Sequence, residues 1–263
     1  MRLPIYQVDA FASQVFGGNP AAVVPLEDWL PDETMQAIAA ENNLSETAFL
    51  LPKGDTWGLR WFTPTTEVPL CGHATLASAW VIYAHLYPDS HAELGFETRS
   101  GLLTVKREGE LLVLDFPARV PEKLDPPAGL ADALGAAPSE VLATTDLLAV
   151  FETADQVRAL KPDMNKLATM DYHAVIVTAP DGGECDFVSR FFAPRIGIPE
   201  DPVTGAAHCA LTPYWSKRLG KTELKAHQVS ARGGELICRD HGDRVALAGY
   251  AVPYLEGTIS VTN

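Results

Sequence analysis

Short apolar runs separated by turn residues recur along the chain and predict a protein rich in β-strands. The opening run Met1–Phe11 has the length and composition of a strand, and residues 47–51 predict a second, buried one. Two further pairs of strands with short polar turns are expected at residues 102–106 and 111–116, and at 235–239 and 244–248.

Three helices are expected between these strands. Residues 31–43 have Pro31 at their start and acidic residues in the first turn, which is typical of a helix N-terminus. Segments 72–80 and 204–211 are rich in alanine and leucine and contain no breaker, which favours buried helices.

One pattern occurs twice, 130 residues apart. Trp61-Phe62-Thr63-Pro64 and Phe191-Phe192-Ala193-Pro194 are each followed by a second proline at the same spacing and then by one of the two buried helices. The spacing pairs Cys71 with Asp201, each expected just before a helix N-terminus. A period of half the chain indicates a duplication rather than a solenoid.

The expected fold is therefore α+β, with two pseudo-symmetric, strand-rich lobes that each surround a central helix. We expect an N-terminal lobe at 1–116, a proline-containing linker at 117–142 and a C-terminal lobe at 143–263. A strand near the C-terminus can return to the first lobe. The cleft between similar lobes is the expected ligand site, because both helix N-termini would direct free N–H groups toward it.

Composition narrows the possible partners. The 263 residues carry a formal net charge of −14 with 47% hydrophobic residues, so a disordered chain, nucleic-acid binding and anionic membrane surfaces are all disfavoured. The longest apolar stretch, residues 74–84, is too short to span a bilayer. Four widely spaced cysteines suggest neither a disulfide framework nor a structural zinc site, and we expect a reduced, cytoplasmic protein.

Several polar residues could carry chemistry, and each also has a purely structural explanation. Glu46 opens a buried strand and could move protons, or it could be a solvent-exposed loop residue. His73 could donate a hydrogen bond or pass a proton, and Asp201 could be a helix N-cap that also orients a substrate amine. The helix N-terminus would lower the pKa of the Cys71 thiol, although a small buried residue is the simpler interpretation. Asn19 could bind a ligand or belong to a turn.

No motif indicates a nucleotide or a metal cofactor. The glycines before Asn19 match no phosphate-binding pattern, and the histidines lack the spacing of a metal-binding motif.

Five short segments along the chain form a distinctive series: Phe16–Val23, Leu44–Phe49, Trp61–Pro64, Val68–Ala77 and Glu200–Gly205. Their residues and their order resemble those of the PhzF-like, phenazine-biosynthesis-like family, and within it the phenazine biosynthesis-like domain-containing proteins.

This resemblance implies a diaminopimelate-epimerase-like fold and a cofactor-independent isomerase acting on a small carboxylate- or amine-bearing metabolite. It assigns general acid–base catalysis to Glu46 and makes His73 and Asp201 the other expected catalytic residues. The residues expected around the substrate are Asn19, Ser45, Cys71, Gly72, Thr204, Gly205 and Ala206. Cys71 and Ala206 depart from the phenazine enzyme, which has no thiol at the first position and a serine at the second, so the substrate is expected to differ. The resemblance also makes a homodimer plausible.

Two alternatives remain open. An amino-acid epimerase or racemase could use Cys71 with a carboxylate on the opposite face of the substrate, although Asp201 stands where a second thiol would be needed. A non-catalytic interaction protein could retain the fold of an isomerase.

Overall fold

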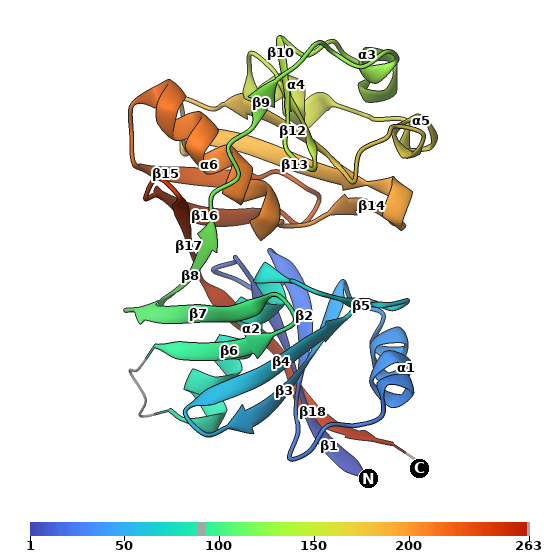
Figure 1. Ribbon diagram of the computed structural model, residues 1–263, viewed down its shortest axis with the longest axis vertical. Helices are drawn as coiled ribbons and strands as arrows, with labels where there is room; N and C mark the ends of the chain where they lie inside the picture. Colours follow the sequence, from blue (N-terminus) through green and yellow to red (C-terminus); the bar gives the residue numbers. More distant parts are fainter. Residues whose placement is uncertain (89–92, 262–263) are drawn as a thin grey trace. The chain divides into compact units, whose positions relative to one another are not determined.

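The computed structural model describes residues 1–88 and 93–261. The chain divides into two compact units, one made of Met1–Asp115 with Ala248–Asn263 and the other of Phe116–Leu247 (Figure 1). Residues 117–142, expected as a linker, contain a short helix and strands that belong to the second unit.

Over its described residues, the first unit is a sheet with two α-helices. Its elements are β1 (Arg2–Ala10), β2 (Asn19–Pro25), α1 (Asp32–Asn42), β3 (Glu46–Lys53), β4 (Thr56–Phe62), β5 (Glu67–Val68), α2 (Gly72–Val81), the π-helical turn η1 (Ile82–Leu86), β6 (Leu94–Thr98), β7 (Gly101–Glu108), β8 (Leu111–Pro117) and β18 (Ala251–Ser260). The β2–β3 and β4–β6 pairs are parallel, and the β1–β2, β3–β4, β4–β5, β6–β7 and β7–β8 pairs are antiparallel.

The two ends of the chain meet in this unit. Strand β18 runs antiparallel to β1 from Arg2↔Ser260 to Ala10↔Ala251, with one irregularity between Gln7 and Val8. The C-terminal strand therefore returns to the N-terminal unit.

Helices α1 and α2 both pack against β3. Met35 and Ile38 of α1 pack in a cluster with Val24 and Phe49. Helix α2 contacts β1, β2 and β3 and is buried along nearly all its length, in keeping with its apolar sequence. The hydroxyls of Thr75 and Ser78 donate to backbone carbonyls one turn earlier, as in the Thr75 Oγ1 to Cys71 carbonyl bond of 2.5 Å.

The second unit repeats this order of elements. It contains β9 (Glu122–Lys123), α3 (Leu130–Leu134), β10 (Glu140–Ala143), β11 (Leu147–Val150), α4 (Ala154–Ala159), α5 (Met164–Ala168), β12 (Val175–Pro180), β13 (Phe187–Ala193), the 3₁₀ turn η2 (Pro194–Ile196), β14 (Ile198–Asp201), α6 (Gly205–Leu219), β15 (Glu223–Gln228), β16 (Gly234–Asp240) and β17 (Arg244–Gly249). The β11–β12 and β13–β15 pairs are parallel, and β10–β11, β12–β13, β13–β14 and β15–β16 are antiparallel. Because both units follow one pairing scheme, the predicted duplication is confirmed.

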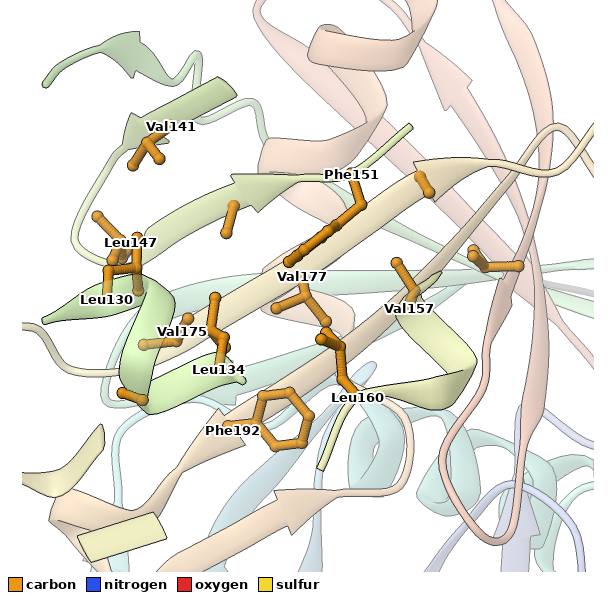
Figure 2. Packing of buried hydrophobic residues seen from close by; sticks show 14 of the residues in the cluster. Leu130, Leu134, Val141, Leu147, Phe151, Val157, Leu160, Val175, Val177 and Phe192 are labelled. Atoms are coloured by element: carbon orange, nitrogen blue, oxygen red, sulfur yellow. The ribbon is translucent and has the colours of Figure 1, made fainter. Parts of the chain in front are cut away.

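An apolar cluster fills the second unit (Figure 2). Val177 of β12 and Phe192 of β13, together with Phe151 directly after β11, meet Leu134 of α3 and Val157 of α4. The apolar residues of α3 explain why the segment expected as a linker is folded: their burial favours packing over an extended connection.

A repeated ion pair fixes the short strand in each unit. Arg60 binds both carboxylate oxygens of Glu67 at 2.7–2.8 Å, and Arg190 binds Glu200 in the same way at 2.8–3.0 Å. The planar guanidinium suits such two-point binding. The motif was missed in the sequence because its partners lie at different spacings in the two copies.

That difference corrects the residue matching inferred from the sequence. Trp61 pairs with Val68, seven residues on, whereas Phe191 pairs with Asp201, ten residues on. Turn η2 and Gly197 lengthen the second copy, so the simple offset of 130 fails beyond them.

The second buried helix is longer than the predicted segment 204–211. Helix α6 continues to Leu219 although Pro213 lies inside it. Proline lacks an N–H group and leaves the Cys209 carbonyl without its helical partner. The Arg119 N–H donates to that carbonyl instead, at 3.0 Å. A hydrogen bond from a residue distant in sequence therefore replaces the helical bond that the proline removes.

Among the described residues, no helix is both long and apolar enough to cross a membrane. All four cysteines are buried and carry no disulfide.

Candidate functional site

Strand β3 begins at Glu46 and directs this side chain toward α2. Side chains alternate between the faces of a strand, and Phe49 of β3 packs with α1. Glu46 therefore shares the opposite face with Ala48 and Leu50. Its side chain is only 12% exposed. The interpretation of Glu46 as a solvent-exposed loop residue is wrong.

Helix α2 brings two more polar side chains to this carboxylate. Cys71 is the N-cap residue, in an extended conformation, and His73 lies in the first turn. The His73 Nε2 atom lies 3.0 Å from Glu46 Oε2, and the His73 Nδ1 atom lies 3.5 Å from Cys71 Sγ. The imidazole thus stands between a carboxylate and a thiol.

The pair of Glu46 and His73 is enclosed. Glu46 Oε2 and His73 Nε2 are both buried, and neither forms an aligned hydrogen bond with any described residue. Burial opposes protonation of His73, but the neighbouring Cys71 and Glu46 outweigh it, so the pKa of His73 lies well above its usual value. A charged imidazole beside the carboxylate is the expected state at neutral pH.

The pKa of the Cys71 thiol is not the one that its position at a helix N-terminus predicts. Burial, reinforced by the negative charge of Glu46, raises the pKa of the thiol to about 11. The helix N-terminus was expected to lower this pKa, and that prediction is wrong because the loss of solvation outweighs the helix dipole. The simpler interpretation of Cys71 as a small buried residue agrees with its 7% exposure.

The remaining predicted residues of the first unit lie at the edges of these elements. Asn19 is fully buried at the start of β2 and shares a face with Ala21, which lies beside Glu46 in the parallel register. Ser45 directly precedes Glu46 and is partly buried, and Gly72 is the first residue of α2.

The residues predicted from the second half of the chain gather at the start of α6. Asp201 ends β14, Thr204 is the N-cap residue, and Gly205 and Ala206 open the helix. The expectation that Asp201 caps this helix is wrong, because the chain continues for three more residues before the helix begins. Asp201 instead accepts a hydrogen bond from Thr204 Oγ1 at 2.5 Å. Thr204, not Asp201, is the structural counterpart of Cys71.

Gln228 holds this segment and was missed in the sequence. Its side chain is fully buried; it accepts a bond from the Thr204 N–H at 2.8 Å and donates to the Asp201 carbonyl at 2.8 Å. The alternation of Leu224, Ala226 and Gln228 on the inner face of β15 was the available signal, since a polar residue at an inward position requires partners.

Comparison with known proteins identifies the family of the chain. The sequence profile of the phenazine biosynthesis-like (PhzC-PhzF) family matches residues 8–257. The chain belongs to this family. The resemblance found in the motifs is thereby confirmed.

Relatives of similar length share the whole chain. An uncharacterised isomerase of Pseudomonas aeruginosa is 54% identical over 263 residues, covering 100% of both chains. A phenazine biosynthesis-like domain-containing protein of Mus musculus is 42% identical over 291 residues, covering 99% of this chain and 100% of the relative. Relatives named isomerases, together with the family, identify the chain as an isomerase.

Solved structures confirm the fold class. A PhzF-family protein of Enterococcus faecalis superposes with a TM-score of 0.96 at 46% identity, covering 99% of this chain and 100% of the other. A hydroxyproline epimerase from Agrobacterium vitis shares the fold alone, with a TM-score of 0.60 at 9% identity, covering 98% of this chain and 92% of the other. The α+β, diaminopimelate-epimerase-like architecture is therefore confirmed.

Proposed function

We propose that this isomerase moves a proton within a small metabolite that carries a carboxylate or an amine, and that it needs no cofactor to do so. Glu46 accepts the proton from an acidified carbon and returns it to a second carbon on the same face. The observation that carries the proposal is the enclosed Glu46 carboxylate, 3.0 Å from the His73 ring. General acid–base catalysis of this kind contributes roughly a hundred- to ten-thousand-fold to the rate.

His73 and the start of α2 supply the electrostatic support. The charged imidazole holds the carboxylate in place and can exchange a proton with it at Nε2. Free N–H groups at the start of α2 offer a site for a substrate carboxylate or for negative charge that develops during the reaction. We also propose Asp201, Thr204 and Gly205 as substrate-binding residues.

The state of Cys71 favours isomerisation over racemisation. Inverting a stereocentre needs an acid and a base on opposite faces, whereas one carboxylate is enough for a transfer on one face. A thiol with a pKa of about 11 is a poor base at neutral pH, and Thr204 rather than a second cysteine occupies the matching helix start.

Proton exchange in deuterated buffer tests the proposal. Candidate amino and hydroxy acids are incubated with the wild type and with Glu46→Gln, and uptake of deuterium is read by mass spectrometry. We expect uptake with the wild type and at least about a hundredfold slower uptake with Glu46→Gln, because the amide cannot accept the proton.

Glu67→Gln is the matched control. Glu67 is a similarly enclosed carboxylate of the first unit, 11% exposed, but it binds Arg60 and Arg99. Its loss should lower the unfolding temperature and leave exchange intact. Uptake that persists in Glu46→Gln and disappears in Cys71→Ala would instead indicate an epimerase that uses the thiol.

A further inference from the structure

The second unit contains a carboxylate–histidine pair of its own, outside the residues assigned above. The His173 Nδ1 atom lies 2.9 Å from Asp146 Oδ1. The Asp146 side chain is only 4% exposed, whereas the His173 side chain is 54% exposed. A buried carboxylate therefore holds one nitrogen of a ring that is otherwise open to solvent.

The strand register places His173 at the position that Ser45 has in the first unit. Strands β3 and β12 each pair with the following strand through equivalent residues, which are Thr47↔Phe62 and Val175↔Phe192. Two residues before these pairs, the chain has Ser45 in the first unit and His173 in the second. Ser45 directly precedes Glu46 and is one of the residues expected around the substrate. His173 therefore occupies the equivalent place in the second unit.

Asp146 lies on the face of the second sheet that meets α6. Its neighbour Leu147 packs in the apolar cluster, so alternation places Asp146 on the opposite face, together with Thr178. The Thr178 hydroxyl oxygen accepts a hydrogen bond from the Trp215 ring of α6 at 3.0 Å, which identifies this face. The corresponding face of the first unit carries Glu46 and meets α2.

Arg119 adds a second positive charge beside His173. Its backbone N–H donates to the Cys209 carbonyl of α6 at 3.0 Å. The hydrogen bond with Asp146 raises the pKa of His173, and the charge of Arg119 acts in the opposite direction, so the two cationic side chains lie near each other. Within residues 1–88 and 93–261, neither the Arg119 guanidinium nor the His173 Nε2 atom has a hydrogen-bond or ion-pair partner.

One carboxylate would complete this group of charges. A charged His173 and Arg119 against an ionised Asp146 leave one net positive charge, on a chain whose formal net charge is −14. Two neighbouring cations repel each other, and an anion held by both removes the repulsion. Guanidinium and imidazolium groups donate strong, charge-assisted hydrogen bonds to carboxylates. A single negative charge matches the group better than a phosphate, which carries about two.

We propose that His173 and Arg119 form a binding site for a carboxylate group, with Asp146 orienting the His173 ring, and that the substrate of the isomerase carries this carboxylate. The second part rests on the proposed function, whereas the binding of a carboxylate does not. The substrate class is thereby narrowed from metabolites with a carboxylate or an amine to those with a carboxylate.

Nuclear magnetic resonance of protein labelled at histidine tests the binding, with acetate as the probe. Acetate and, in a separate experiment, chloride are added to the full-length protein at neutral pH. We expect acetate to move the His173 ring signals, assigned as those missing in His173→Gln, in a saturable way, and to leave those of the exposed His241 in place. Arg119→Gln should bind acetate about tenfold more weakly, because it removes a charged hydrogen-bond donor.

Kinetics with a compound that exchanges deuterium test the link to the substrate. His173→Gln should raise KM about tenfold and change kcat by less than about threefold, because it removes binding shared by the ground state and the transition state. His173→Lys keeps a positive charge and should restore most of the affinity, whereas a merely structural role would make both variants alike. His227→Gln is the matched control: His227 belongs to the same unit, lies 3.7 Å from the Glu235 carboxylate, and should leave KM unchanged.

Three results would overturn the carboxylate site: His173 signals that acetate does not move, signals that chloride moves as strongly, or acetate that binds Arg119→Gln as tightly as the wild type. Acetate binding together with an unchanged KM in His173→Gln would show that the bound carboxylate is not that of the substrate. Acetate binding without proton exchange by any compound would contradict the proposed function and leave the carboxylate site standing.

Discussion

Gln228 shows how one buried side chain can hold the segment that carries Asp201 and Thr204. Its amide bridges the Thr204 N–H and the Asp201 carbonyl and also donates to Thr204 Oγ1 at 3.1 Å. A buried amide of this kind stabilises chiefly because its partners have no water to replace it.

Replacing Gln228 with leucine should therefore destabilise the second unit. Leucine fills a similar volume but leaves the Thr204 N–H and the Asp201 carbonyl without this partner, which costs about 1–3 kcal/mol for each group. Urea unfolding of Gln228→Leu measures the loss. Gln36→Leu, which removes a single bond to the Thr63 carbonyl, should cost less. Equal losses in the two variants would contradict the bridging role.

The buried residue His208 makes the stability of the second unit depend on pH, and the direction of this effect can be predicted. Burial of its ring lowers its pKa to about 4, although a hydrogen bond with the Thr204 carbonyl opposes this. In the unfolded chain the His208 ring takes up a proton near pH 6.5, whereas in the folded state it stays neutral down to a lower pH. The free energy of unfolding is therefore at its full value above about pH 6.5 and decreases as the pH falls toward 4.

Urea unfolding between pH 4 and pH 7 should show this loss, up to roughly 3 kcal/mol. His208→Gln should flatten that part of the stability curve, since it removes the titrating ring. His241→Gln, at an exposed histidine, is the control and should leave the curve unchanged. Identical slopes in His208→Gln and the wild type would show that His208 does not set the acid sensitivity.

At the scale of elements, the site depends on where β2, β3 and α2 begin. Glu46 is the first residue of β3 and Cys71 the N-cap residue of α2, so both side chains lie at the ends of their elements. Gly18 controls the start of β2. It has a φ of +63°, and a Cβ there would lie 2.1 Å from the Ala10 carbonyl oxygen.

Gly18→Ala should therefore be strongly destabilising, with a steric penalty of about 1–3 kcal/mol added to the cost of a positive φ. Gly54→Ala measures the cost of a positive φ alone, since Gly54 has a φ of +60° and nothing lies within 4 Å of the Cβ that alanine would add. Gly54→Ala should cost only about 1–2 kcal/mol. Thermal or urea unfolding compares the two, and equal costs would rule out the clash with Ala10.

At the scale of the whole molecule, the first unit is built from both ends of the chain. Strand β18 covers the edge of β1, and the chain ends are joined by the bond from the Val261 N–H to the Met1 carbonyl at 2.9 Å. The second unit has its own core, drawn from residues 130–192. The two units should therefore differ in their dependence on the C-terminal segment.

Truncation after Tyr250 should open the first unit selectively. Without β18, the backbone of β1 loses one of its two antiparallel partners, and that edge is exposed to water. Hydrogen exchange read by mass spectrometry should show lost protection in residues 1–25 and retained protection in residues 147–193. Uniform loss across both units would indicate that they unfold as one. A homodimer and a cytoplasmic location stay predictions.

The sequence by itself predicted several of the helices and strands, and the duplication. The expected helices at 31–43 and 72–80 and both strand pairs correspond to α1, α2 and the strands β7, β8, β16 and β17, because apolar periodicity and turn residues act locally. The motifs also identified the family from short segments whose order is specific. The catalytic roles of Glu46 and His73 stay predictions.

Only the tertiary structure decided which residues meet and in what state. The three-residue longer turn in the second copy makes Thr204 rather than Asp201 the counterpart of Cys71, and β15 brings Gln228 to them. The high pKa of the Cys71 thiol follows from burial beside Glu46, a residue 25 positions away in the chain. Register, burial and the partner of each polar atom depend on contacts between distant segments, and those contacts exist only once the chain has folded.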